Sequence, residues 1–211
     1  MLARVRTVLC FGDSNTWGTD PATGNRFPRD ARWPGRLQLA LGDEWHVVEE
    51  GLGGRTATLD SPLAPGKNGL AYLRPCLDSH APLDVVVIFL GNNDLADRYA
   101  LSATDVARAV GRLVVEVRSS EAGVGGRAPR VLLICPPRVG DTVWEEGWQS
   151  VPAKSAVLPD RFRLVAEELG VDLVDLSTVT RYSDLDGIHL DADAHGAVAR
   201  AIEAALRRIE P

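Results

Sequence analysis

Hydrophobic residues along the chain follow two alternating patterns. Runs rich in apolar and β-branched residues occupy 7–11, 46–51, 84–91, 130–137 and 171–176. The runs at 84–91 and 130–137 are almost continuously apolar, which is typical of strands buried on both faces of a parallel sheet. The pattern therefore predicts five strands, most of them internal to one sheet.

The segments between these runs show apolar residues at helical spacing. Four such segments predict helices, at 32–42, 102–120, 151–170 and 191–210. Ser102 is a residue type that caps helix starts, and Gly42 and Gly170 suit helix ends. Pro159 is expected to kink or split the third helix, because proline lacks the backbone N–H of a helix interior.

Strands that alternate with helices indicate an α/β class fold with three layers, α/β/α, around a parallel sheet. A chain of 211 residues suits one domain with a full core, so we expect a single domain over 1–211. In such folds, ligands bind beyond the carboxyl ends of the strands. Polar residues just after each predicted strand are therefore the candidates for chemistry.

Composition and charge exclude several classes of function. Hydrophobic residues make up 45% and charged residues 25% of the chain, and the net charge is -6 with its basic residues scattered. This balance argues against a nucleic-acid partner, which needs clustered Lys and Arg. No apolar run approaches the length of a membrane span or of a secretory signal, so no membrane partner is expected. The three cysteines form no CxxC pair and favour a reducing compartment, which predicts a cytoplasmic protein.

The first predicted strand runs directly into four small polar residues, 13–16, in the stretch "FGDSNTWG". Either a turn or a nucleophile at the edge of the sheet would explain this stretch. Similar polar or glycine-rich segments follow other strands: "EGLGGRT" at 50–56, "GNND" at 91–94 and, near the end of the chain, "DLDGIHLDADAH" at 184–195. Each segment taken alone is also compatible with a simple turn.

Several alternatives for these segments are weak. The glycine segment has Gly51 and Gly53, but Thr56 stands where a dinucleotide-binding motif needs its third glycine. The segment at 184–195 lacks ligands of a calcium loop. Metal ligands are a possible role for His189, His195, Asp191 and Asp193, but the two aspartates suit the start of the last helix better. No metal and no cofactor are expected.

An Asp-x-x-His pair within one loop has a more specific meaning. Asp186 precedes His189 by three residues, so its carboxylate is able to orient the imidazole and steady its charged form. With Ser14 at a strand end, this pair makes His189 a candidate general base.

The four segments together resemble the SGNH hydrolases, also called the GDSL family. Block I corresponds to "FGDSNTWG", block II to "GLGGRT", block III to "GNND" and block V to "DGIH", in this order between residues 8 and 190. Stretches such as "EEGLGGRT" and "PLDVVVIFLGNND" resemble the intracellular arylesterase and acyltransferase subgroup. The resemblance implies a flavodoxin-like arrangement of the five-stranded parallel sheet.

The resemblance also implies residue roles. Ser14 would be the nucleophile, His189 the base and Asp186 its orienting partner. The oxyanion hole would be formed by the backbone N–H groups of Ser14 and Gly54 and by the side-chain amide of Asn93.

Other residues are expected near the substrate. The sequence has Asn15 after the nucleophile, where the subgroup has leucine, and glycine at both 53 and 54. Asn15, Trp17 and Gly53 are the tentative pocket residues, although Trp17 is equally compatible with packing under the loop. Trp33 and Trp45 are expected in the core. In the loop 138–150, Trp144 and Trp148 are interpreted as lining either the site entrance or a contact between subunits of a homo-oligomer.

These observations predict a serine esterase that hydrolyses short-chain acyl esters, acetyl or aryl, through an acyl-enzyme, with transfer to alcohols as a second outcome. Its partner would be a small-molecule ester. One alternative is a carbohydrate O-acetylesterase of the same fold. Another is a magnesium-dependent phosphoryl-transfer enzyme that uses Asp13, although Asn15 stands where its second acidic residue is expected. A silent binding module is disfavoured by the intact Ser14, Asp186 and His189.

Overall fold

The five predicted strands form one parallel sheet in the computed structural model, which describes residues 4–143 and 146–209. The strands lie in the order β2-β1-β3-β4-β5, and every neighbouring pair is parallel. The predicted three-layer α/β/α fold with a flavodoxin-like sheet is therefore confirmed. The strands are β1 (Arg6–Gly12), β2 (Trp45–Gly51), β3 (Val85–Phe89), β4 (Arg130–Cys135) and β5 (Asp172–Asp175).

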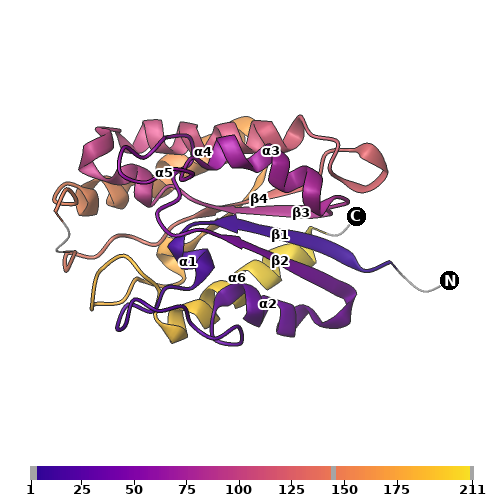
Figure 1. Ribbon diagram of the computed structural model, residues 1–211, viewed down its shortest axis with the longest axis horizontal. Helices are drawn as coiled ribbons and strands as arrows, with labels where there is room; N and C mark the ends of the chain where they lie inside the picture. Colours follow the sequence, from indigo (N-terminus) through magenta and orange to yellow (C-terminus); the bar gives the residue numbers. More distant parts are fainter. Residues whose placement is uncertain (1–3, 144–145, 210–211) are drawn as a thin grey trace.

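Helices cover both faces of this sheet (Figure 1). On one face α2 packs against α6, and on the other α4 packs against both α3 and α5. The α-helices are α1 (Ser14–Trp17), α2 (Trp33–Leu41), α3 (Gly69–His80), α4 (Ala103–Arg118), α5 (Val151–Leu169) and α6 (Ala192–Arg208). Short 3₁₀ turns are η1 (Gly42–Glu44), η2 (Asn93–Leu95), η3 (Asp97–Tyr99), η4 (Val124–Gly126) and η5 (Leu176–Thr178).

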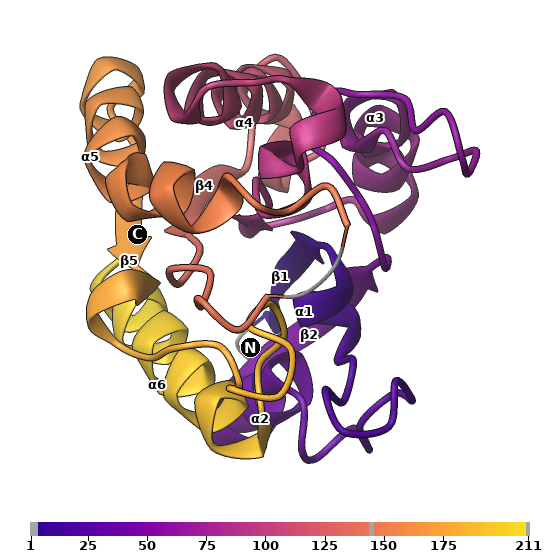
Figure 2. The same cartoon turned by 90° about the vertical axis from the view of Figure 1, so that its left-hand side faces the viewer.

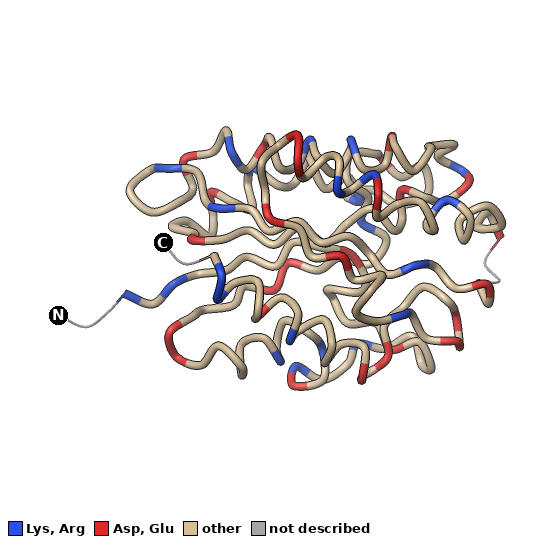
Figure 3. Tube along the Cα trace, turned by 180° about the vertical axis from the view of Figure 1, so that it is seen from behind, with Lys and Arg blue, Asp and Glu red and all other residues tan. Residues whose placement is uncertain are grey.

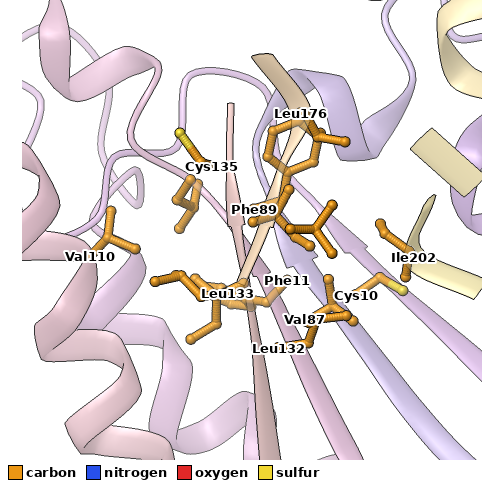
Figure 4. Packing of buried hydrophobic residues seen from close by; sticks show 14 of the residues in the cluster. Cys10, Phe11, Val87, Phe89, Val110, Leu132, Leu133, Cys135, Leu176 and Ile202 are labelled. Atoms are coloured by element: carbon orange, nitrogen blue, oxygen red, sulfur yellow. The ribbon is translucent and has the colours of Figure 1, made fainter. Parts of the chain in front are cut away.

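The core lies between the sheet and both helix layers. Figure 4 shows Phe11, Val87 and Phe89 from the central strands packed among residues of β4, α4 and α6. All five residues of β3 are buried, as their continuous apolar pattern predicts. Cys10, Cys76 and Cys135 are free and buried. Trp33 and Trp45 lie in the core as expected.

Two helices were not predicted, and one expected interruption does not occur. α3 contains Pro75 in its interior, which weakens the helical signal, and α1 is a single turn after β1. Pro159 was expected to kink or split the third helix, but α5 runs through it without a break. Leu158 and Phe162 are fully buried on either side of this proline, so tertiary packing outweighs the missing hydrogen bond.

The helix ends follow the expected chemistry. Ser102 and Asp105 form a capping box at the start of α4, and Gly170 ends α5 in the left-handed conformation. Acidic and basic residues are interspersed along the Cα trace in Figure 3. Within the described residues, no helix has the length and apolar character needed to cross a bilayer.

The topology fixes where the chemistry is able to occur. The sheet order changes direction between β1 and β3, and in folds of this kind ligands bind beyond the carboxyl ends of the strands at such a point. Figure 2 looks onto this edge, where α1 follows β1 and lies beside the golden loop that precedes α6. Ser14 follows β1, and Asn93 follows β3.

Candidate active site

Ser14 is the first residue of α1, directly beyond the end of β1. Asp13 caps this helix, because its carboxylate accepts the backbone N–H of Asn15 at 2.9 Å. The chain turns back so tightly that a Cβ on Gly12 would lie 2.0 Å from the Thr16 hydroxyl. Glycine is therefore required at the strand end, and the tight turn presents Ser14 at the edge of the sheet.

His189 connects Ser14 to Asp186. Its Nε2 lies 3.0 Å from Ser14 Oγ, and its Nδ1 lies 2.7 Å from Asp186 Oδ2. The other carboxylate oxygen, Asp186 Oδ1, accepts the backbone N–H groups of Ile188 and His189, each at 3.0 Å. The loop therefore fixes the carboxylate, and the carboxylate in turn fixes the imidazole ring. The structure brings these three predicted residues together in the expected order.

The Asp186 carboxylate stays ionised in this environment. Burial raises its pKa, but hydrogen bonds from the His189 side chain and from the backbone N–H groups of Ile188 and His189 outweigh burial. The net result is a pKa below the ordinary value for aspartate. A permanently charged carboxylate beside Nδ1 stabilises the imidazolium that forms when Nε2 accepts a proton.

Asn15 does not line a substrate pocket, contrary to expectation. The side chain is 1% exposed. Its amide nitrogen donates to the Ile188 carbonyl at 3.1 Å, and its amide oxygen accepts the Leu190 N–H at 3.0 Å. Both ends of the amide are therefore hydrogen-bonded, and Asn15 connects α1 to the loop that carries His189. This link holds Ser14 and His189 in register.

The predicted oxyanion donors come from three segments. Ser14 N–H and Gly54 N–H form no hydrogen bond with any residue that the structure describes, so both are available as donors. Asn93 is 9% exposed, and its Nδ2 donates to the Arg55 carbonyl at 3.0 Å. The remaining N–H of this amide has only a long contact of 3.4 Å with Asp13 Oδ2.

Arg55 was not identified from the sequence. It is 3% exposed, and its Nη1 donates to the carbonyls of Gly12 and Glu50, the first at 3.0 Å. The guanidinium lies 4.2 Å from the ring centroid of Phe11. Arg55 thus connects the glycine segment at 50–56, called the glycine loop below, to the ends of β1 and β2. The loop also carries the carbonyl that holds Asn93. No local sequence pattern distinguishes this buried arginine from the other basic residues scattered along the chain.

Two buried carboxyl groups lie behind the donors. Burial raises the pKa of Asp13 to about 6. The pKa of Asp94 is raised to about 7, chiefly by burial and to a smaller extent by the nearby Asp13. Both oxygens of Asp94 accept the backbone N–H of Ala57, at 2.9 and 3.1 Å. Asp94 therefore fixes the chain that leaves the glycine loop, a role that the motif "GNND" did not reveal.

Replacing Asp94 with Asn is expected to change how stability depends on pH. The unfolded chain releases this proton near pH ~3.9, whereas the folded chain holds it to about pH 7. Between these values the unfolding free energy falls as pH rises, by at most ~1.4 kcal/mol per pH unit for one proton. Asn does not titrate, so the variant should gain relative stability across this window. Urea unfolding at several pH values measures this difference.

The exposed Asp160→Asn change is the matched control for this prediction, because the Asp160 side chain keeps 70% of its surface in solvent. Its stability relative to the unaltered protein is measured over the same window. An Asp94→Asn difference that does not change with pH would contradict the prediction.

The loop 138–150 packs partly against the Asp186–His189 loop. Gly140 N–H donates to the Gly187 carbonyl at 2.9 Å, and a Cβ on Gly187 would lie 2.9 Å from Val143 N. Trp148 was expected to be exposed at an entrance or a subunit contact, but it is 2% exposed. The apolar ring packs inward with the core cluster, which corrects that prediction. Trp144 lies outside the described residues.

Two of the possible metal ligands near the end of the chain have other roles in the structure. Asp191 caps α6 by accepting the Ala194 N–H at 2.8 Å. His195 is fully buried, and its Nδ1 accepts the Trp33 N–H at 3.2 Å. Burial lowers the pKa of His195 to about 3, so the ring stays neutral.

One group of potential metal ligands is present elsewhere in the described residues, formed by Glu50, Cys76 and His80. Glu50 already pairs with His80 at 2.9 Å, and its other oxygen contacts the Tyr72 hydroxyl at 3.4 Å. Burial raises the pKa of the Cys76 thiol to about 12, so the sulfur stays protonated. These protein contacts account for the cluster.

A family model decides the class of this site. The model of the GDSL-like lipase/acylhydrolase family matches residues 10–197, a span that includes Ser14, Asn93, Asp186 and His189. The chain belongs to this family. It is a carboxylic ester hydrolase. A comparison with curated protein sequences gave no match.

Solved structures agree with this assignment. The M. smegmatis aryl esterase is 34% identical, with a TM-score of 0.90 over 97% of this chain and 100% of that chain. Est24, a carbohydrate acetylesterase from Sinorhizobium meliloti, is 34% identical, with a TM-score of 0.91 and the same coverage. A carbohydrate acetylesterase family member from that species is 36% identical, with a TM-score of 0.91 over 96% and 98% of the two chains.

The phosphoryl-transfer alternative finds no support in the structure. Its nucleophile would be Asp13, which is 1% exposed and caps α1 through its carboxylate. A carboxylate in this position does not face a substrate.

Proposed function

We propose that this esterase hydrolyses short-chain acyl esters through an acyl-enzyme formed on Ser14. The observation that carries this proposal is the hydrogen-bonded series from Asp186 through His189 to Ser14, with distances of 2.7 and 3.0 Å. A serine hydroxyl becomes a strong nucleophile only when a base removes its proton as it attacks. His189 Nε2 is within the range for that proton transfer.

The reaction proceeds in two halves. Ser14 Oγ attacks the ester carbonyl carbon while His189 Nε2 takes the hydroxyl proton, and the leaving alcohol receives this proton when the ester C–O bond breaks. Water then attacks the acyl-enzyme, giving its proton to His189, and the acid departs as Ser14 regains the proton. Asp186 holds the Nδ1–H throughout and stabilises the charged ring.

Negative charge develops on the carbonyl oxygen in both halves. The proposed donors to this oxygen are the backbone N–H groups of Ser14 and Gly54 and the second amide hydrogen of Asn93, which has only the long contact with Asp13 Oδ2. Such donors act strongly because they are fixed before the reaction begins. Asn93 is held by Arg55, and the Ser14 backbone is held by the α1 cap, so both donors are preorganised.

The proposed acyl pocket favours small groups. Trp17 is half-buried one turn after Ser14 in α1, and Arg26 lies over its ring at 5.2 Å. We place Trp17 and Gly53 beside the acyl group, with acetyl as the preferred size. Aryl acetates and acetylated carbohydrates are both candidate substrates, because the similar solved proteins are an aryl esterase and a carbohydrate acetylesterase.

A substrate series tests this proposal. With p-nitrophenyl esters, kcat/KM is expected to be highest for acetate and to fall as the chain lengthens, by roughly tenfold for each methylene that does not fit. An added alcohol should yield a new ester from the same acyl-enzyme, measured by product analysis. Acetylated sugars are tested in parallel to decide between the two substrate classes. Equal rates for acetate and long-chain esters would contradict the short-chain pocket.

The proposed setting is the cytoplasm. All three cysteines are free and buried, which supports a reducing compartment. Lys and Arg positions are interspersed with Asp and Glu along the Cα trace in Figure 3, which does not favour binding of nucleic acid. The proposed partner is therefore a small ester, with no macromolecular partner required for the chemistry.

A further inference from the structure

The glycine loop forms a tight turn around the peptide group between Gly53 and Gly54. The turn is closed by a hydrogen bond of 3.1 Å from Arg55 N–H to the Leu52 carbonyl. Gly54 has a φ of +74°, whereas Gly53 is not among the positive-φ glycines. A positive φ at the third residue distinguishes a type II turn from type I, so the turn is of type II.

The central peptide of such a turn is able to face two ways. Types I and II differ mainly by a half rotation of this one peptide group. Because the C=O and N–H of a trans peptide point in opposite directions, the rotation would reverse the Gly54 N–H. Glycine at both central positions leaves the rotation unopposed. A Cβ added at Gly53 would meet no atom within 4 Å.

Lys67 holds this peptide in one orientation. Its ammonium donates to the Gly53 carbonyl at 2.7 Å, a charge-assisted hydrogen bond. Its aliphatic stem lies along the other glycine, because a Cβ on Gly54 would be 3.8 Å from the lysine Cε. The Lys67 backbone is itself anchored, since its carbonyl accepts the Thr56 N–H at 2.9 Å.

We propose that Lys67 is a positioning residue for ester hydrolysis, which keeps the Gly54 N–H directed at the oxyanion by holding the Gly53 carbonyl. The proposal rests on the proposed function, in which Gly54 N–H is an oxyanion donor. The ammonium acts on the carbonyl of the same amide group that supplies the donor. It therefore also polarises that amide and strengthens its N–H as a donor.

A purely structural role for Lys67 predicts a different result. If the lysine only fastened the segment before α3 to the loop, its loss would lower the unfolding temperature and leave each folded molecule fully active. A role in orienting the donor predicts a lower kcat at nearly unchanged KM, because the donor acts on charge that exists only in the transition state.

The test replaces Lys67 with Met, which keeps the stem and removes the ammonium. We expect kcat per active site to fall by at least about tenfold. The fall should be smaller than the ~10²–10³ expected when one donor is lost completely. KM should stay nearly constant. Lys67→Arg should recover most of the activity because it restores a charged donor. Active sites are counted by fluorophosphonate titration, so unfolded molecules do not enter kcat.

The matched control is Lys154→Met. The chain has only these two lysines, and the Lys154 ammonium also donates to a backbone carbonyl, that of Leu95. We expect its kcat to be close to that of the unaltered protein. An equal loss in both variants would overturn the proposal, because it would reflect a general loss of loop anchoring.

A second variant tests the orientation directly. Proline at the second position of a turn with glycine at the third favours type II. Adding Gly53→Pro to Lys67→Met should therefore raise kcat above that of Lys67→Met alone. The proposal is contradicted if the added proline does not raise kcat. It is also contradicted if kcat of Lys67→Met stays within about twofold of the unaltered protein, because such a change is far smaller than the loss of one donor. If instead the unaltered protein is neither labelled at Ser14 nor active on esters, the proposed function itself fails.

Discussion

Replacing Ser14 with alanine is expected to lower kcat for ester hydrolysis by about 10⁴–10⁶-fold while the protein stays folded. The hydroxyl is the only atom group lost, and it lies 3.0 Å from His189 Nε2 at the open edge of the sheet. His189→Ala should reduce kcat to a similar depth, because a serine without its base is a weak nucleophile. Steady-state kinetics with an aryl acetate measures both variants.

The double variant makes this prediction sharper. Because the two side chains act as one unit, removing both should cost little more than removing either alone. Ser119→Ala serves as the control, since this exposed serine lies at the end of α4 away from the sheet edge. A Ser14→Ala protein that keeps a tenth of its activity would show that another residue is the nucleophile.

The fold was predictable because its two internal strands β3 and β4 are nearly continuous apolar runs. β3 and β4 lie inside the sheet, and their sequences leave little alternative. The sequence did not reveal α3, because Pro75 interrupts its pattern and its stability comes from packing against α4. Pro159 misled for the same reason. Local propensity predicted a break that the buried Leu158 and Phe162 override.

The site was predictable only where residue type and chemistry coincide within a short motif. Asp186 and His189 are three residues apart, so their pairing is local. Arg55 and Lys67 act through backbone carbonyls that are close only after the loop has folded. Asn15 shows the opposite error. A polar residue beside the nucleophile looks like a pocket residue, although its amide bonds to the chain 173 residues away.

Replacing Asn93 with alanine is expected to lower kcat by ~10²–10³, or roughly 3–4 kcal/mol in the activation barrier, with KM nearly unchanged. The amide donates to charge that appears only in the transition state, so substrate binding is little affected. Asn92→Ala is the control within the same loop, because Asn92 is similarly buried but has no proposed role as a donor. Its kcat should remain near that of the unaltered protein.

Asn93→Asp separates the two roles that this side chain has in the structure. The Asn93 amide also fastens the loop by donating to the Arg55 carbonyl at 3.0 Å, a bond worth ~1 kcal/mol of stability. If fastening were its whole purpose, both variants would unfold more easily and retain near-normal kcat per titrated site. In the oxyanion role, Asp places a carboxylate where a donor is needed, 3.4 Å from the buried Asp13. Activity should then fall at least as far as with alanine. A folded Asn93→Asp enzyme with near-normal kcat per fluorophosphonate-titrated site would remove Asn93 from the mechanism.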